Sequence, residues 1–320
     1  MKHESRGTVL IAMGSNAVIA LAKFLAGLAT GNTAMLAEAV HSTVDTANEG
    51  LMLMGLVRSQ RPADAQHPFG YGRELYFWTL MVAVIIFGVG GGVTMLEGFY
   101  RIVHPPGLES PRWDYVVLAI AAVFEGISWT RAYRQVRRRG GRRSTLDLIR
   151  ASKDPTGFTV LLEDSAALTG LAIAALGTFF AHAFRNAAIE GFASIAIGLV
   201  LAAVAVFLVR ETRGLLIGES APRETIEDIQ SIAASDPAVA DVRRALTMQL
   251  APDEVLLNID LAFHRGGGDD VARAVDRIER SIRGKHPEVT RIFVEAQSLV
   301  AAIDAGGGEA EAERGRSSRS

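Results

Sequence analysis

Six apolar stretches, each long enough to cross a lipid bilayer, constrain the fold of this chain more than any other feature. A membrane-spanning helix needs about 20 apolar residues. Backbone groups inside a bilayer must be satisfied within the segment, so stretches of this length are expected to be helical. They cover residues 8–30, 33–57, 75–103, 115–136, 156–181 and 187–209. The sequence therefore predicts a membrane all-α bundle of six transmembrane helices within residues 1–213.

The remainder of the chain has the character of a water-soluble domain. Charged residues make up 21% of a chain that is 49% hydrophobic, which fits a membrane part joined to a soluble part. Residues 222–234 and 269–285 have helical patterns, and 242–250, 255–264 and 290–296 have strand patterns. This order, αββαβ, predicts a small cytoplasmic ferredoxin-like α+β domain over residues 214–300. Residues 301–320, rich in Gly, Ala, Glu, Arg and Ser, are predicted to be a disordered tail.

Basic residues predict the orientation in the membrane. Arg58, Arg61 and Arg73 lie between the second and third stretches, and a larger Arg and Lys cluster at 131–153 lies between the fourth and fifth. Such residues stay on the cytoplasmic side, so we expect a multi-pass inner-membrane protein with both termini cytoplasmic. The cluster sits beside a membrane and lacks interleaved aromatics. It therefore indicates contact with lipid headgroups and not with nucleic acid.

The second stretch carries His41 and Asp45, four residues apart, with Asn48 on the same helical face. An imidazole and a carboxylate so placed form half of a site for a divalent transition metal. Ionisable groups at membrane depth are costly and usually mark a substrate path. The alternative is a His–Asp pair that satisfies itself between helices. The chain has no cysteine, so any metal must be held by nitrogen and oxygen ligands.

The fifth stretch carries two adjacent acids, Glu163 and Asp164. They point about 100° apart on a helix, so we do not expect them to share one role easily. Asp164 would lie ~14 Å from the cytoplasmic side and Asp45 ~18 Å, close enough in depth to share one ion. The alternative is an acid hydrogen-bonded to Ser or Thr. Glu125, in the fourth stretch, is a weaker candidate.

The loop after the second stretch contains Asp64 and His67, followed by Pro68 and Gly70. An acid and an imidazole so close together are a candidate second metal site on the cytoplasmic side. A structural turn leading into the third stretch explains the same residues equally well.

These pieces together resemble the cation diffusion facilitator family. The resemblance rests on AEAVHSTVD at 37–45 and HPFGYGRE at 67–74, within the six-helix and αββαβ layout. It implies a homodimeric exporter that exchanges a divalent cation, most often Zn²⁺, for protons. His41, Asp45 and Asp164 match the family's central ligands.

One family ligand has no match, because Val160 stands where many members have His. Glu163 or Asn48 are the candidates to replace it. A site with one imidazole and several oxygens tolerates Mn²⁺, Fe²⁺ or Co²⁺ besides Zn²⁺. The Glu-Asp pair resembles the family's divergent zinc-transporter-like branch.

In the soluble domain, the positions that bind metal in some members are Ala240, Asp260, Phe293 and Glu295. Two acids without imidazole make a poor transition-metal site, so this domain is expected to serve dimerisation. We expect no enzymatic activity and no cofactor beyond the transported cation, since HExxH is absent. A non-transporting metal sensor or partner subunit with the same fold is the alternative function.

Overall fold

A computed structural model describes residues 13–14, 16–22, 24–25, 28, 33–105, 111–138, 153–264 and 268–298. Within these ranges the side chains of residues 33–38, 40, 41, 113, 135, 138, 297 and 298 are not described. The chain forms two compact units, Met1–Ile217 and Gly218–Ser320.

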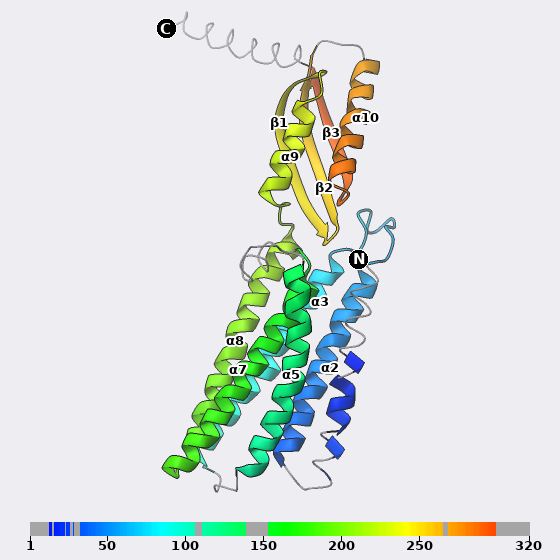
Figure 1. Cartoon of the computed structure of the whole chain (residues 1–320). Coiled ribbons are helices and arrows are strands. Elements are labelled where there is room, and N and C mark those ends of the chain that lie inside the picture. Colours follow the sequence, from blue (N-terminus) through cyan, green and yellow to red (C-terminus); the bar gives the residue numbers. More distant parts are fainter. Residues whose placement is uncertain are drawn as a thin grey trace, which may run out of the picture. The chain divides into compact units, whose positions relative to one another are not determined.

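Long helices build the first unit (Figure 1). They are α2 (Thr33–Arg58), α3 (Glu74–Ile85), η1 (Ile86–Val93), α4 (Thr94–Val103), α5 (Arg112–Arg138), α7 (Pro155–Phe184) and α8 (Ala188–Ile217). Four helical spans among the described residues are long and apolar enough to cross a membrane, namely Glu74–Val103, Asp114–Arg134, Pro155–Phe184 and Ala188–Ile217. These match the third to sixth predicted stretches.

The first two predicted stretches are not among these four spans. Stretch 33–57 forms α2, a helix of 26 residues. Stretch 8–30 lies partly outside the described residues, and those that are described are helical. The total of six membrane-spanning helices therefore stays a prediction.

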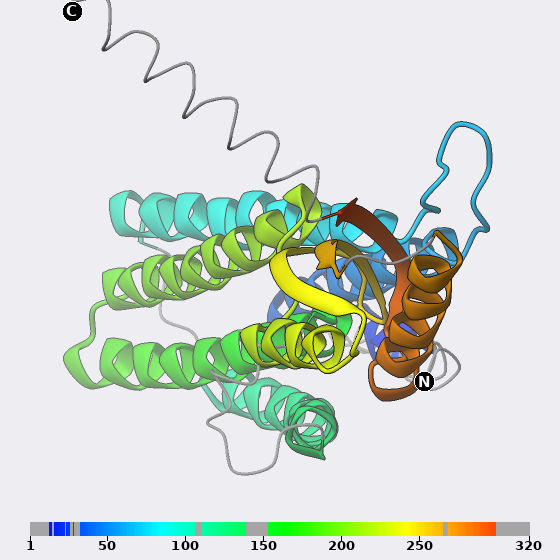
Figure 2. The ribbon, with the colours of Figure 1, turned by 90° about the horizontal axis from the view of Figure 1, so that it is seen from above.

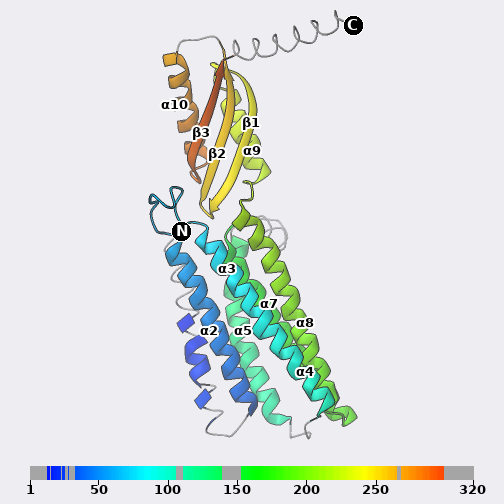
Figure 3. The same ribbon diagram turned by 180° about the vertical axis from the view of Figure 1, so that it is seen from behind.

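The helices of this unit pack around one apolar core. α7 contacts α5 on one side and α8 on the other, and α2 contacts α3. Figure 2 shows the bundle from above, and in Figure 3 α3 and α4 form one rod beside α8. Large buried side chains from four helices meet in this core, among them Met52, Val82, Phe158 and Leu208. This packing holds α2, α5 and α7 together, so that polar side chains from all three helices line one cavity.

Glycines let the rod formed by η1 and α4 approach α8 closely. A Cβ added to Gly98 would lie 2.6 Å from the carbonyl oxygen of Gly191, and one added to Gly191 would lie 2.6 Å from that of Gly98. Gly91 and Gly198 repeat the contact two turns away, where a Cβ on Gly198 would lie 2.8 Å from the Gly91 oxygen. Small residues are typical of close helix contacts in membranes.

The third stretch departs from the expected uninterrupted α-helix at η1. Residues Ile86–Val93 form a π-helical segment with the sequence IFGVGGGV. Glycine has the weakest preference for the α-helix among residues that keep a backbone N–H, so this segment yields most easily to a wider turn.

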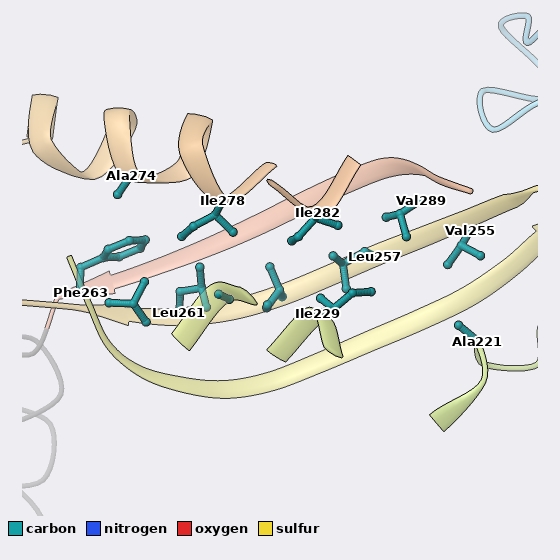
Figure 4. Close-up of a cluster of buried hydrophobic side chains, with 13 residues drawn as sticks. Ala221, Ile229, Val255, Leu257, Leu261, Phe263, Ala274, Ile278, Ile282 and Val289 are labelled. Atoms are coloured by element: carbon teal, nitrogen blue, oxygen red, sulfur yellow. The ribbon is translucent and has the colours of Figure 1, made fainter. Parts of the chain in front are cut away.

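The second unit has the predicted order αββαβ. It consists of α9 (Arg223–Ala234), β1 (Val239–Ala251), β2 (Glu254–Phe263), α10 (Gly268–Lys285) and β3 (Val289–Ser298). The sheet order is β1-β2-β3, with β1 antiparallel and β3 parallel to β2. Both helices cover the same face, where Leu257, Ile259 and Leu261 of β2 are fully buried against Ile229 and Ile278 (Figure 4). The predicted strand at 255–264 is confirmed, and every second residue of β2 from Val255 to Leu261 is buried.

The border between the units lies beyond the predicted one at residue 213. The sixth stretch was expected to end at residue 209, but α8 continues to Ile217. It ends where Gly218 adopts a positive φ of 116°, a conformation that glycine adopts without steric cost. The predicted tail at 301–320 lies outside the described residues.

A bidentate ion pair joins α10 to the turn after α9. Arg277 donates from Nε to Oδ2 of Asp236 at 2.9 Å and from Nη2 to Oδ1 at 2.9 Å. These bonds hold the pKa of Asp236 below its usual value. The pair therefore stabilises the folded unit only while Asp236 is ionised.

We predict that Gly191→Ala destabilises the membrane unit, because the new methyl group would overlap the backbone of α4. Overpacking of this kind typically costs about 1–3 kcal/mol. Gly126→Ala is the matched control, since a Cβ there meets nothing within 4 Å. Thermal unfolding of both variants in detergent checks this. Equal melting temperatures for the two variants would contradict the close α4–α8 contact.

We predict that Asp236→Asn lowers the Tm of the isolated soluble unit at neutral pH. The contribution of Asp236 is complete above the unfolded-state pKa, about 3.9, and is lost as pH falls through the lower folded-state pKa. The Tm difference between variant and parent should therefore persist at pH 5 and shrink in more acidic solution. Circular dichroism melts measure it, with Asp276→Asn on α10 as control. A difference that does not change with pH would refute the ion-pair explanation.

Candidate cation site

Helix α7 presents Glu163 and Asp164 because its start is set by local sequence. Asp154 is the N-cap, its side chain accepts the backbone N–H of Thr156 at 3.2 Å, and Pro155 takes the first helical position. The helix then runs for 30 residues. Val160 consequently lies about one and a half turns from its beginning, and Glu163 and Asp164 lie between two and three turns from it.

Helix α2 presents a second set of polar residues to the same region. Asp45, Asn48 and Glu49 lie within little more than one turn. Thr43 and Thr46 bond back to the carbonyl oxygens of Ala39 and Ser42 at 2.8 and 2.7 Å, so their hydroxyls are satisfied within the helix. Asp45, Asn48 and Glu49 instead face other helices.

These residues enclose a cavity of about 40 Å³ inside the first unit. Its volume exceeds the space that one water molecule needs. Five carboxylate side chains line it, from Asp45, Glu49, Glu125, Glu163 and Asp164. None of the described residues in its wall is basic; the others are Asn16, Val44, Asn48, Ile86, Gly90, Val160, Ala167 and Leu201.

Hydrogen bonds connect the helices around the cavity. Asn48 donates from Nδ2 to Oε1 of Glu163 at 2.9 Å, which joins α2 to α7. Asp164 is hydrogen-bonded to Ser128 of α5. The two adjacent acids thus have different partners, as their angular separation predicts, yet both line one cavity. Their shared place in the cavity wall does not assign them a shared role, so the expectation that they would not share one role easily stays a prediction.

Three buried oxygens around the cavity lack a hydrogen-bond partner among the described residues. They are Oδ1 of Asn48, Oε2 of Glu49 and Oδ2 of Asp164. The exposed fractions of these residues are 1%, 6% and 8%, so water does not satisfy them from outside. Buried polar atoms are nearly always paired, and those left over call for an explanation such as an ion.

The predicted ligands are only partly tested by this arrangement. The cavity wall contains four of the predicted ligands, Asp45, Asn48, Glu163 and Asp164. It also contains Val160, an apolar residue at the position where a ligand is expected. The side chain of His41 lies outside the described residues, although its backbone is in α2. Across the described part of the chain, no three His, Asp or Glu side chains are positioned to hold one metal ion. The carboxylates surround a shared space without converging on a point.

Sequence reasoning missed Glu49. The signal was present, because His41, Asp45 and Glu49 follow each other at intervals of four residues. That interval keeps side chains on one side of a helix. Glu125, a weak candidate from sequence, also lines the cavity. By contrast, Glu97 is not part of the cavity wall. Its Oε1 forms an ion pair with Nη2 of Arg101 at a distance of 2.8 Å.

The loop residues Asp64 and His67 are close together, with 3.6 Å between Oδ1 and Nδ1. Oδ1 of Asp64 also accepts the backbone N–H groups of Gln66 and His67, at 2.9 and 2.7 Å. Oδ2 accepts the hydroxyl of Tyr71 at 2.6 Å. These bonds lower the pKa of Asp64, and its carboxylate in turn raises the pKa of Tyr71. This network organises a turn, and metal binding here stays a prediction.

In the soluble unit, Asp260 and Glu295 are register partners on β2 and β3. Ala240 and Phe293 have no ligating side-chain atom. The two acids therefore have no additional side-chain ligand at the other two family positions, and the expectation that this domain serves dimerisation stays a prediction.

Comparison with known proteins identifies relatives. A family model described as the cation efflux transmembrane domain matches residues 9–217. The proton-coupled zinc antiporter SLC30A9, mitochondrial, of Mus musculus is 31% identical over 257 residues, covering 80% of this chain and 45% of that protein. Metal tolerance protein C4 of Arabidopsis thaliana is 30% identical over 267 residues, covering 82% of this chain and 58% of that protein.

A bacterial relative matches over nearly its full length. The manganese efflux system protein MneP of Bacillus subtilis is 23% identical over 293 residues, which is 91% of this chain and 95% of that protein. The mouse and plant relatives are longer, and the chain spans about half their length.

Proposed function

Because the chain belongs to the cation diffusion facilitator family of cation efflux proteins, we propose that it exports a divalent transition-metal cation from the cytoplasm in exchange for protons. Zn²⁺ is the first candidate, since one group of relatives is named for proton-coupled zinc antiport. Mn²⁺ is the second, since another relative is named for manganese efflux. Fe²⁺ and Co²⁺ suit the same donor types.

The observation that carries this proposal is the cavity with five carboxylates between membrane helices. Like charges at close range in a medium of low dielectric repel each other strongly. A cavity of this kind is stable only if cations or protons neutralise it. A site that alternates between a divalent cation and protons meets this requirement in both states.

Binding and release follow from the chemistry of the donors. His41, Asp45 and Asp164 bind the cation in their deprotonated forms, with Asn48 or Glu163 completing the shell. A rearrangement of the bundle then exposes the cavity to the opposite side. Protons compete for the same atoms there and release the cation. Histidine is suited to this exchange because it titrates near neutral pH.

The membrane arrangement forms part of the proposal. Six helices cross an inner membrane, with both termini in the cytoplasm, because the basic residues after α2 and around α5 favour that side. The αββαβ unit joins two copies into a homodimer. The protein acts as a transporter without enzymatic activity or a resident cofactor.

We predict that Asp45→Ala and Asp164→Ala each reduce metal-driven proton flux at least about tenfold, since each removes a charged donor from the cavity. The measurement uses proteoliposomes with a pH-sensitive dye inside and external Zn²⁺, Mn²⁺, Fe²⁺ or Co²⁺. Asp114→Ala, at the start of α5 and outside the cavity wall, is the control. Full activity of both cavity variants would exclude this site.

The alternative of a metal sensor or partner subunit is favoured by Val160, which offers the cavity no donor. The same vesicles decide between the two functions. Cation binding without flux of any of the four ions would indicate the sensor. Flux that depends on a pH gradient would indicate the antiporter.

A further inference from the structure

We propose that Glu49 is a ligand of the transported cation and sets its selectivity, taking over the donor role that is absent at Val160. This inference rests on the proposed transport function and deepens it. Neither the relatives nor the family resemblance assigns a role to this residue. The geometry of its two carboxylate oxygens provides the first argument.

The two oxygens of Glu49 have different surroundings. Oε1 accepts a hydrogen bond from Nδ2 of Asn16 at 3.0 Å, which fixes the carboxylate against the first helical segment. Oε2 is buried and has no partner among the described residues. Glu49 lines the cavity and is 6% exposed. A carboxylate oxygen buried without a partner is costly, and a cation in the cavity would compensate it.

Among the described residues, the neighbours of Glu49 offer no counter-charge. The described ionisable groups that face it are all acids, namely Asp45 on its own helix, Glu125 on α5, and Glu163 and Asp164 on α7. A purely structural carboxylate would be expected beside Arg or Lys, and no described residue in the cavity wall is of that kind. The charge distribution therefore fits a bound cation and not an ion pair within the protein.

Two further unpartnered oxygens belong to the same cavity wall, Oδ1 of Asn48 and Oδ2 of Asp164. Asn48 and Glu49 on α2 and Asp164 on α7 therefore supply one unpartnered acceptor atom each. The amide nitrogen of Asn48 is already used in its hydrogen bond to Glu163. The carbonyl oxygen of Asn48 is thereby left for a cation. Such a set is rich in oxygen and poor in nitrogen.

Donor type predicts the selectivity that Glu49 provides. Carboxylate and carbonyl oxygens suit Mn²⁺, whereas imidazole favours Zn²⁺. Val160 removes an imidazole from the site and Glu49 adds a carboxylate. Together they shift the metal preference of the site from Zn²⁺ toward Mn²⁺. Loss of Glu49 should consequently weaken Mn²⁺ binding more than Zn²⁺ binding.

The test measures binding and transport on the full-length protein. Glu49→Gln keeps the size of the side chain and an acceptor for Asn16, but removes the charge. Calorimetric titration with Mn²⁺ and with Zn²⁺ should show Mn²⁺ affinity reduced about tenfold or more, and a smaller loss for Zn²⁺. Glu97→Gln, whose carboxylate pairs with Arg101 outside the cavity wall, is the matched control and should leave both affinities unchanged.

The outcomes separate this inference from the proposed function. If Glu49→Gln leaves both affinities and the ratio of Mn²⁺ affinity to Zn²⁺ affinity unchanged, the proposed role of Glu49 is refuted. In that case, metal-driven proton flux by the parent protein would still support the antiporter function. A parent protein that binds neither ion overturns both. If Glu49→Gln does not fold, the same affinity ratio is measured for Glu49→Asp. This substitution shortens the side chain by one methylene and so moves the carboxylate away from the cavity. A shift of the ratio supports the proposal, and no shift refutes it.

Discussion

The hydrogen bond from Asn48 to Glu163 is the interaction on which the site depends, because it joins α2 to α7 across the cavity. Helices that carry several acids at one depth repel each other unless something holds them together. Asn48 provides a donor at that point without adding a positive charge. It thereby keeps the cavity negative, as a cation site requires, while the helices remain in contact.

Helix packing elsewhere in the unit gives this contact its setting. The glycine pairs between the rod formed by η1 and α4 and helix α8 bring two backbones close together. The π-helical segment η1 lies in the same rod, and its residues Ile86 and Gly90 reach the cavity wall. π-helical turns occur frequently at functional sites. The apolar side of the cavity is thus built by the part of the third stretch that departs from regular α-helical geometry.

Local sequence patterns predicted most of the fold. The helices and strands of the second unit arise in the predicted order, because their patterns rest on neighbouring residues and follow short-range rules. The predictions failed at two segments that glycine controls and at one acid. The π-helical turn in the third stretch was not foreseen, and α8 runs to Ile217, past its predicted end. Glu49 was missed although its spacing from Asp45 places it on the same helical face, and its placement beside Asn16, Glu125 and Asp164 is what brings it to attention.

The sequence by itself determined the helical character of the first unit, the αββαβ order of the second and the positions of four apolar spans, since hydrophobic length and helical spacing depend on order along the chain. The tertiary structure alone decided which polar atoms share one cavity. It brought Glu125 to that cavity and placed Glu163 and Asp164 along the same wall. It also left single oxygens of Asn48, Glu49 and Asp164 buried without partners. Those facts depend on the rotation and approach of packed helices, which residue order does not specify.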